Sequence, residues 1–239
     1  VGDDMFHLQY LTQRGHDWQL VWVIRRDLIT GQSDANEMTM AWKFHWVTMT
    51  GDYDLMLARH YGQSMVGLGM AKNAGSLVIR ADLLSHDLSV QDDWLYLINT
   101  DYTWDCFNKN CHFFIEYFHN EAGQKGIDLA TILPGSKLYE RLNRGELYVL
   151  GTDYLGLGLN TQLTALSSVN LTVMWNLQDN SNFSILGYLY EFQQNLQFQT
   201  GLMLSSGGAN TEFGGLYDSV NTDYQASASM VFAQLAYYF

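Results

Sequence analysis

Apolar and polar residues alternate along most of the chain, and the alternation resumes after each break. It is clearest in residues 152–163 and 170–178, where Leu171, Val173 and Trp175 occupy every second position. A period of two places successive side chains on opposite faces of a β-strand. The pattern therefore predicts thirteen strands, at residues 5–13, 17–26, 37–50, 53–60, 64–71, 77–84, 93–104, 112–120, 152–163, 170–178, 183–192, 196–205 and 226–239.

The connections between these strands fall into two alternating sets. One set is short throughout and consists of residues 14–16, 51–52, 72–75, 105–111, 165–169 and 193–195. The other set holds every long connection, at residues 27–36, 85–92, 121–150 and 206–223. Short turns at one end of a sheet and long loops at the other are typical of outer-membrane β-barrels. The longest connection, 121–150, is expected to be a surface loop with short helices at 128–133 and 136–142, folding either over the mouth or into it.

Composition agrees with an all-β membrane protein. The 239 residues include one proline, 15 tyrosines and seven tryptophans, and 15% of them are charged. Many strands with aromatic residues near the membrane interfaces require such a composition. No stretch approaches the roughly 20 consecutive apolar residues of a membrane-spanning helix. The sequence therefore predicts an all-β fold, a transmembrane antiparallel up-and-down β-barrel that occupies residues 1–239 as a single domain.

The net charge is −13, which excludes nucleic acid as a partner because no basic face is available to neutralise phosphates. Acidic residues cluster between the predicted strands. Solvated loops are the simpler interpretation, and divalent ions that bridge the loops to lipopolysaccharide are the alternative. These acids are Asp27, Asp34, Glu37, Asp87, Asp92, Asp93, Glu121, Asp128, Glu212, Asp218 and Asp223.

The last strand carries a resemblance to a known family. Leu235, Tyr237 and Phe239 stand at alternate positions and end on an aromatic residue. This arrangement resembles the C-terminal signal of bacterial outer-membrane β-barrels, which implies recognition by the barrel-assembly machinery and a location in the bacterial outer membrane, in contact with its lipids.

A second resemblance covers the segments 51–75, 114–120 and 151–182, which read GDYDLMLARHYGQSMVGLGMAKNAG, FIEYFHN and GTDYLGLGLNTQLTALSSVNLTVMWNLQDNSN. They are similar to an uncharacterised group of proteobacterial outer-membrane barrel proteins with a porin-like fold. In that group residues 1–6 would follow several earlier strands. Since bacterial single-chain barrels have an even number of strands, we expect 14 or more in the complete protein, with Val1 either a processed end or the start of a retained piece.

Function is expected to depend on the residues that face the lumen. The ionisable ones are mixed in sign: Arg25, Lys43, His45, Asp54, His60, Arg80, Asp82, Asp101, Glu116 and Glu191. Opposed charges across a lumen would make a selectivity filter for small hydrophilic solutes, which predicts a porin-like channel. The same charges would also form a structural network in a plugged barrel that serves a periplasmic export or lipid-transfer system, and the two interpretations stay open.

Other chemistry is less well supported. Cys106 and Cys111 are so close that a disulfide closing a turn is favoured over a metal site. The seven histidines show no metal-ligand spacing, so we expect no metal and no cofactor. The nearest hydrolase combinations are His60 with Ser64 and Ser85 with His86, but neighbouring strand residues point to opposite faces. No enzyme is predicted, and association into a homo-oligomer is left open.

Overall fold

The computed structural model describes residues 3–26, 30–86, 93–106, 108–124, 132, 134–218, 223–225 and 228–239. The chain divides into two compact units, Val1–Ile98 (unit 1) and Asn99–Phe239 (unit 2). Thirteen strands form one antiparallel sheet, in which each strand neighbours the next of the thirteen along the chain. The predicted all-β fold of thirteen consecutive antiparallel strands is therefore confirmed.

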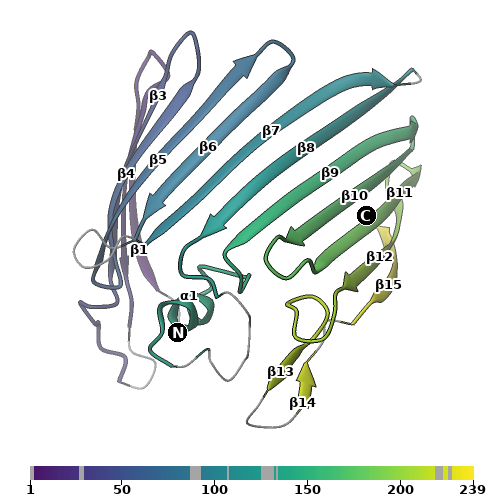
Figure 1. Cartoon of the computed structure of the whole chain (residues 1–239). Helices are drawn as coiled ribbons and strands as arrows, with labels where there is room; N and C mark the ends of the chain where they lie inside the picture. The colour runs from purple at the N-terminus through teal and green to yellow at the C-terminus, as the bar shows by residue number, and fades with distance from the viewer. Residues whose placement is uncertain are drawn as a thin grey trace. The chain divides into compact units, whose positions relative to one another are not determined.

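Unit 1 contains six complete strands and the first residues of a seventh (Figure 1). Each strand lies within a few residues of its predicted position, because the alternation of apolar residues marks the strands directly. The strands are β1 (Asp4–Leu11), β2 (Asp17–Ile24), β3 (Thr39–Val47), β4 (Asp52–His60), β5 (Gln63–Ala74), β6 (Leu77–Ser85) and the start of β7 (Trp94–Cys106).

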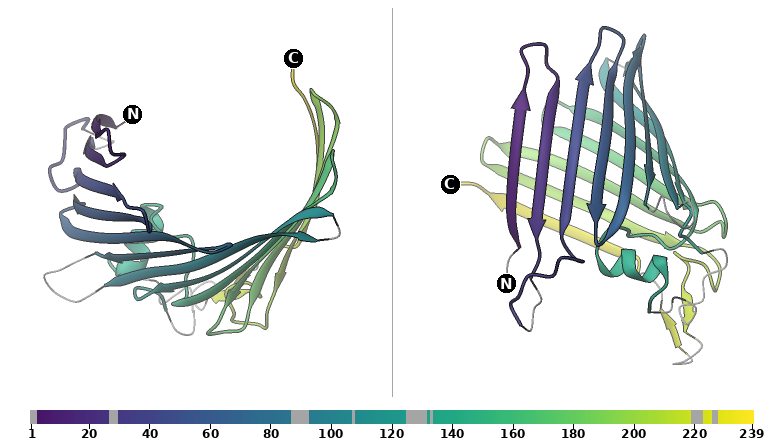
Figure 2. Two further views of the ribbon diagram at one scale, coloured as in Figure 1. Left: turned by 90° about the horizontal axis from the view of Figure 1, so that it is seen from above. Right: turned by 90° about the vertical axis from the view of Figure 1, so that its left-hand side faces the viewer.

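Unit 2 contains the rest of β7 and six further strands of the sheet, which lie side by side in Figures 1 and 2. They also agree with the predicted positions, except that the last strand begins at Met230, later than expected. The strands are β8 (Lys109–Asn120), β9 (Asp153–Thr164), β10 (Ser167–Asn176), β11 (Asn182–Gln193), β12 (Leu196–Ser206) and β15 (Met230–Tyr237).

Two small elements lie in the long connections of unit 2. Helix α1 (Lys137–Asn143) begins after Ser136, whose hydroxyl accepts a hydrogen bond from the backbone N–H of Tyr139 at 3.2 Å, as a helix N-cap does. It confirms the helix expected at 136–142, whereas the helix expected at 128–133 lies largely outside the described residues. The hairpin of β13 (Leu216–Asp218) and β14 (Asp223–Gln225) was not predicted, because strands of three residues are too short to show alternation.

The lengths of the connections follow the predicted alternation. Residues 12–16, 48–51, 75–76, 107–108, 165–166 and 194–195 form one set, and none of these connections exceeds five residues. The alternate set includes 25–38, 121–152 and 207–229. In unit 2, α1 and the β13–β14 hairpin lie at the same end of the strands, where β8 ends and β9 begins (Figure 2). We call this the long-loop end, and the opposite end the short-turn end.

Strand pairing sorts the side chains of each unit into two faces. We call one the apolar face: in unit 1 it carries Trp42 opposite Leu57 and Leu55 opposite Leu68, and in unit 2 Leu159 opposite Leu171. The other, which we call the polar face, carries Lys43, Asp54, Glu116, Asn170 and Gln199 in the same registers. Along each strand, the two faces alternate with the period of two that was read from the sequence.

Large apolar side chains on the apolar face are exposed rather than covered. Phe6 is 56% exposed, Leu68 50% and Ile98 51%. Among the described residues only eight apolar side chains are buried, whereas a soluble protein of this size buries most of its large apolar residues. The described part of the chain contains no helix that is both long enough and apolar enough to span a membrane.

Aromatic residues concentrate toward the ends of the strands on the apolar face. At the short-turn end of unit 1, the ring centroids of Trp18 and Phe44 lie 4.2 Å apart, and those of Trp46 and Tyr53 lie 5.1 Å apart. In β2, Trp18 and Trp22 flank Leu20, and in β10 Trp175 stands one residue before the strand ends at Asn176. Aliphatic residues such as Leu55 and Leu57 occupy the middle of the strands.

Candidate functional site

A row of ionisable side chains crosses the polar face of unit 1. The strand registers place Asp17 opposite His45, His45 opposite Asp54, and Asp54 opposite Gly69, which in turn faces Asp82. The Asp54 carboxylate accepts from Lys43 Nζ at 2.9 Å and lies 3.0 Å from His45 Nδ1. The Lys43 and Asp54 side chains are 43% and 32% exposed, so this row faces solvent.

Gly69 keeps a gap open within the row. A Cβ atom at this position would lie 2.8 Å from Asp82 Oδ1 and 3.2 Å from Asp54 Cβ, closer than side chains normally pack. Any other residue would push the two acidic side chains aside. Glycine here therefore lets Asp54 and Asp82 stand over the same stretch of β5 backbone.

A second group lies near the long-loop end of unit 1. Arg25 donates from Nη1 to Thr39 Oγ1 at 2.6 Å and to the Glu37 carbonyl at 2.7 Å, and its guanidinium lies 4.5 Å from the Tyr61 ring centroid. His60 Nδ1 lies 2.6 Å from Thr39 Oγ1. The hydrogen bonds and the cation–π contact hold the guanidinium against the sheet.

The polar face of unit 2 carries polar contacts between β7 and β8. His112 Nε2 lies 3.6 Å from Asp101 Oδ1, and Asn99 donates to Glu116 Oε2 at 3.2 Å. Glu191 is exposed and stands opposite Gln197, close to the short-turn end. These contacts join β7 to β8, whereas Glu191 belongs to the hairpin of β11 and β12.

Part of the longest connection covers the polar face of unit 2. Residues 146–149 line a cavity of about 330 Å³ together with Phe114, Phe118 and Tyr154, which project from β8 and β9. Leu147 is 6% exposed and Tyr154 only 2%. Gly158 allows the Phe114 ring to lie flat on the sheet, because a Cβ there would come within 1.9 Å of the ring. The connection therefore covers part of the polar face and buries Leu147 and Tyr154 beside this cavity.

The carboxylate of Glu212 closes this packed region at the long-loop end. Tyr154 donates its hydroxyl to Glu212 Oε2 at 2.5 Å, Asn176 donates to the same oxygen at 2.8 Å, and the Leu150 N–H donates to Oε1 at 2.8 Å. The Glu212 N–H donates to Asp179 Oδ2 at 2.7 Å. Burial raises the pKa of the Glu212 carboxyl above its usual range, although the three donors oppose this shift.

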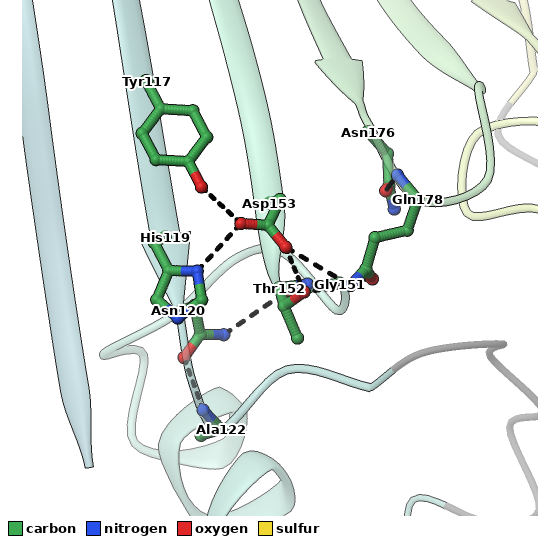
Figure 3. Close-up of polar contacts among 9 residues, drawn as sticks. All are labelled: Tyr117, His119, Asn120, Ala122, Gly151, Thr152, Asp153, Asn176 and Gln178. Atoms are coloured by element: carbon green, nitrogen blue, oxygen red, sulfur yellow. Dashed lines mark hydrogen bonds and ion pairs between the residues drawn. The ribbon is translucent and has the colours of Figure 1, made fainter. Parts of the chain in front are cut away.

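A separate polar cluster surrounds Asp153 on the apolar side of the same strands (Figure 3). Its carboxylate accepts from the Tyr117 hydroxyl at 2.5 Å and from Thr152 Oγ1 at 2.6 Å, and it lies 2.8 Å from His119 Nδ1. Gln178 reaches the carboxylate from the turn after β10, at 3.4 Å. The cluster ties β8 and β9 to the turn after β10, and with so many donors around it Asp153 is a structural acceptor.

The ten residues predicted to face the lumen share the polar face, but not one site. Eight of them lie on this face in the strand registers: Lys43, His45, Asp54, His60, Arg80, Asp82, Glu116 and Glu191. Arg25 and Asp101 contact polar-face residues, namely Thr39 and His112. Lys43 and His45 both contact Asp54, and the roles predicted for all ten stay predictions.

The disulfide between Cys106 and Cys111 is confirmed and closes the turn from β7 to β8. The hydrolase combinations gain no support, since Ser85 and His86 are 1% and 5% exposed and point to opposite faces if the strand continues. No group of three or more metal-ligating side chains that could hold an ion occurs in the described ranges.

Sequence reasoning missed Glu212, which had been interpreted as one of the solvated acids of the loops. Asp93, another of these acids, is 3% exposed, so it is not solvated either. The segment SSGGANTEFGG around Glu212 has no alternation and no apolar run. The one local indication is the phenylalanine that follows Glu212, because Phe213 is buried and packs 6.1 Å from the ring of Phe183.

Comparison with known proteins gives one distant likeness. No protein-family model matches the chain, and no curated protein matches it. A porin structure refined at 1.8 Å resolution is similar over 85% of this chain and 86% of the porin chain, with 9% sequence identity and a TM-score of 0.46. A likeness this distant does not identify a function.

Proposed function

We propose that this chain forms an outer-membrane β-barrel whose apolar face contacts lipid and whose polar face lines the lumen. The observation that carries the proposal is the exposed apolar face that runs through the strand registers of each unit. Backbone groups in a bilayer must find hydrogen-bond partners within the protein, which consecutive antiparallel strands provide. Aromatic residues near the strand ends and aliphatic residues between them fit the interfacial girdles of such barrels.

The proposed activity is passive passage of small hydrophilic solutes. The polar face of unit 1 offers the solvent-facing row around Lys43, His45 and Asp54, with charges of both signs. Charges and hydrogen-bonding groups along a water-filled path select solutes by sign and size. Neither a cofactor nor a catalytic step is part of this proposal.

Several contacts of such a barrel follow from its location. Outer-membrane lipids would cover the apolar face, and lipopolysaccharide would surround the long loops. The barrel-assembly machinery would read the C-terminal strand through Leu235, Tyr237 and Phe239. Whether copies of the chain associate into a homo-oligomer is a further question, which cross-linking in the membrane answers.

A second candidate is a plugged barrel that serves as a partner of a periplasmic export or lipid-transfer system. The observation that favours it is the cover over the polar face of unit 2, where residues 146–149 and Glu212 pack against Tyr154. Side chains that fill a narrow lumen would block solute flow. The short turns would then be the surface offered to a periplasmic partner.

Single-channel conductance separates the two candidates. The protein, in full length where a longer precursor exists, is refolded and inserted into a planar bilayer under a salt gradient. We expect steady ohmic steps with a measurable ion preference. A folded, heat-modifiable barrel that does not conduct would rule out the channel. Co-purification of a periplasmic protein would then support the plugged barrel as a partner of an export or lipid-transfer system.

A further inference from the structure

We propose that Glu212 is a pH-sensitive latch that fastens the segment 207–215 to the polar face of unit 2 and to the end of the 121–150 connection. The latch itself is a property of unit 2. Its effect on solute passage rests on the channel function proposed above.

The geometry makes Glu212 the meeting point of three segments. Its carboxylate accepts from Tyr154 of β9, from Asn176 of β10 and from the backbone of Leu150. Tyr154 is bound on its other side, because its hydroxyl accepts from the Gly151 N–H at 2.5 Å. Breaking the contacts of this single side chain would therefore release the segment 207–215 from two strands and from residue 150 of the long connection at once.

A second attachment sets where the segment would pivot. Asp179 accepts from the Glu212 N–H, and Ser181 Oγ accepts from the Phe213 N–H at 3.2 Å. Both belong to the turn 177–181 between β10 and β11, and both are independent of the charge state of the Glu212 side chain. The segment would thus stay tethered to this turn while its contact with Tyr154 and Leu150 opens.

The electrostatic surroundings determine the direction of the switch. The titratable groups that face Glu212 are Tyr154 from β9 and Asp179 from the turn 177–181, whereas β10 supplies an amide and residue 150 a backbone N–H. Within the described residues no basic side chain contacts this carboxylate. An ionised Glu212 is therefore a partly buried anion beside the carboxylate of Asp179, and three hydrogen bonds offset part of its desolvation.

The raised pKa of Glu212 determines whether rising pH fastens or releases the segment 207–215. The pKa of this carboxyl is higher in the fastened state than in the released state. It therefore stabilises the fastened state most at low pH, where the carboxyl is protonated in both states. That stabilisation is lost as the pH rises through the pKa of the fastened state. The ratio of released to fastened segment changes about tenfold for each pKa unit of difference.

A spin label on the segment tests the latch without using conductance. Because the two native cysteines form a disulfide, A209C supplies a single reactive thiol at an exposed position. The mobile fraction of the label is measured in the folded protein from about pH 4 to about pH 8, a range that brackets a raised glutamate pKa. We expect mobility to rise with pH in the wild-type background and to stay nearly constant in E212Q, whose amide cannot ionise.

Two further variants and one control label sharpen the result. D179N removes the neighbouring negative charge, so the transition is expected at lower pH. E37Q makes the same change from glutamate to glutamine in an exposed residue of unit 1 and is expected to leave the transition unchanged. A label at A165C in a short turn is expected to show no pH response.

Mobility that is independent of pH in the wild-type background, or an unchanged transition in E212Q, would overturn the latch. A transition in a protein that does not conduct would keep the latch and refute the channel.

Discussion

The polar faces of the two units differ in what stands over them. In unit 1 the face carries the row around Lys43 and Asp54, whose side chains are 43% and 32% exposed. In unit 2 the face carries Tyr154 and Asn176, which are 2% and 1% exposed beneath parts of the long connections. The same strand pattern therefore supports a solvated charged surface in one unit and a covered, partly buried surface in the other.

The difference follows from the connections rather than from the strands. The connection between β8 and β9 returns to the sheet through Leu147, and the one after β12 returns through Glu212 and Phe213. On the polar face of unit 2, the aromatic residues Phe114 and Phe118 line a cavity together with residues 146–149 of the first of these connections. If the channel proposal holds, charge selection belongs to unit 1, and restriction of the passage belongs to unit 2.

The largest effect is expected from G158A, which tests whether the polar face of unit 2 is tightly packed. A Cβ at residue 158 would come within 1.9 Å of the Phe114 ring, so the ring must move. We expect a loss of about 2–3 kcal/mol in the free energy of unfolding, as for an overpacked core. Denaturant unfolding in detergent micelles, followed by tryptophan fluorescence, measures it.

G156A is the matched control in the same strand. Its Cβ would meet Glu116 Cβ at 3.5 Å, an ordinary contact distance, so its stability is expected to stay the same or rise slightly. Equal stabilities of the two variants would show that Phe114 is free to yield, and the contrast between the units would lose its physical basis.

A smaller effect is expected from Y154F, which removes the hydroxyl between the Gly151 N–H and Glu212. The buried N–H and the carboxylate each lose a partner, which costs about 1–2 kcal/mol in the free energy of unfolding. The same unfolding experiment measures this loss.

Y148F is the control, because it removes a hydroxyl from a side chain that is 88% exposed and is expected to leave the free energy of unfolding unchanged. An equal loss in both variants would contradict a structural role for the Tyr154 hydroxyl.

The smallest effect on stability is expected from K43Q in unit 1. The ion pair between Lys43 and Asp54 is partly exposed, and solvent-exposed ion pairs contribute less than about 1 kcal/mol to the free energy of unfolding. The change removes a positive charge from the polar face, so the reversal potential of a conducting channel should shift toward cation selectivity. K72Q, which makes the same charge change at the exposed short-turn end of β5, is the control. Identical reversal potentials for the two variants would remove Lys43 from the selectivity row.

Most of the fold could be predicted from the sequence, because each strand alternates and its neighbours alternate in phase with it. The helix at Lys137–Asn143 was also predicted within one residue at each end. The β13–β14 hairpin was missed, since a strand of three residues such as Leu216–Asp218 cannot show a period of two. The disulfide between Cys106 and Cys111 could be predicted from spacing alone.

The candidate site could be predicted only where it lies on strands. Period two assigns Lys43, His45 and Asp54 to one face, but it does not say which of them touch. Glu212 could not be found, because an acid in a glycine-rich connection has the same local sequence whether it is solvated or buried. Its position depends on Tyr154 and Asn176, which are 58 and 36 residues away in the sequence.

The strand registers also limit how the length of this chain can change. Since alternate residues belong to opposite faces, one residue inserted between Leu55 and Leu57 would exchange the two faces for the rest of β4. The two-residue connection at 61–62, which follows β4, leaves little room to absorb such an insertion. Insertions in residues 34–36 would leave the pairing of the thirteen strands intact. An added peptide therefore fits best in that connection, where added length costs little conformational entropy.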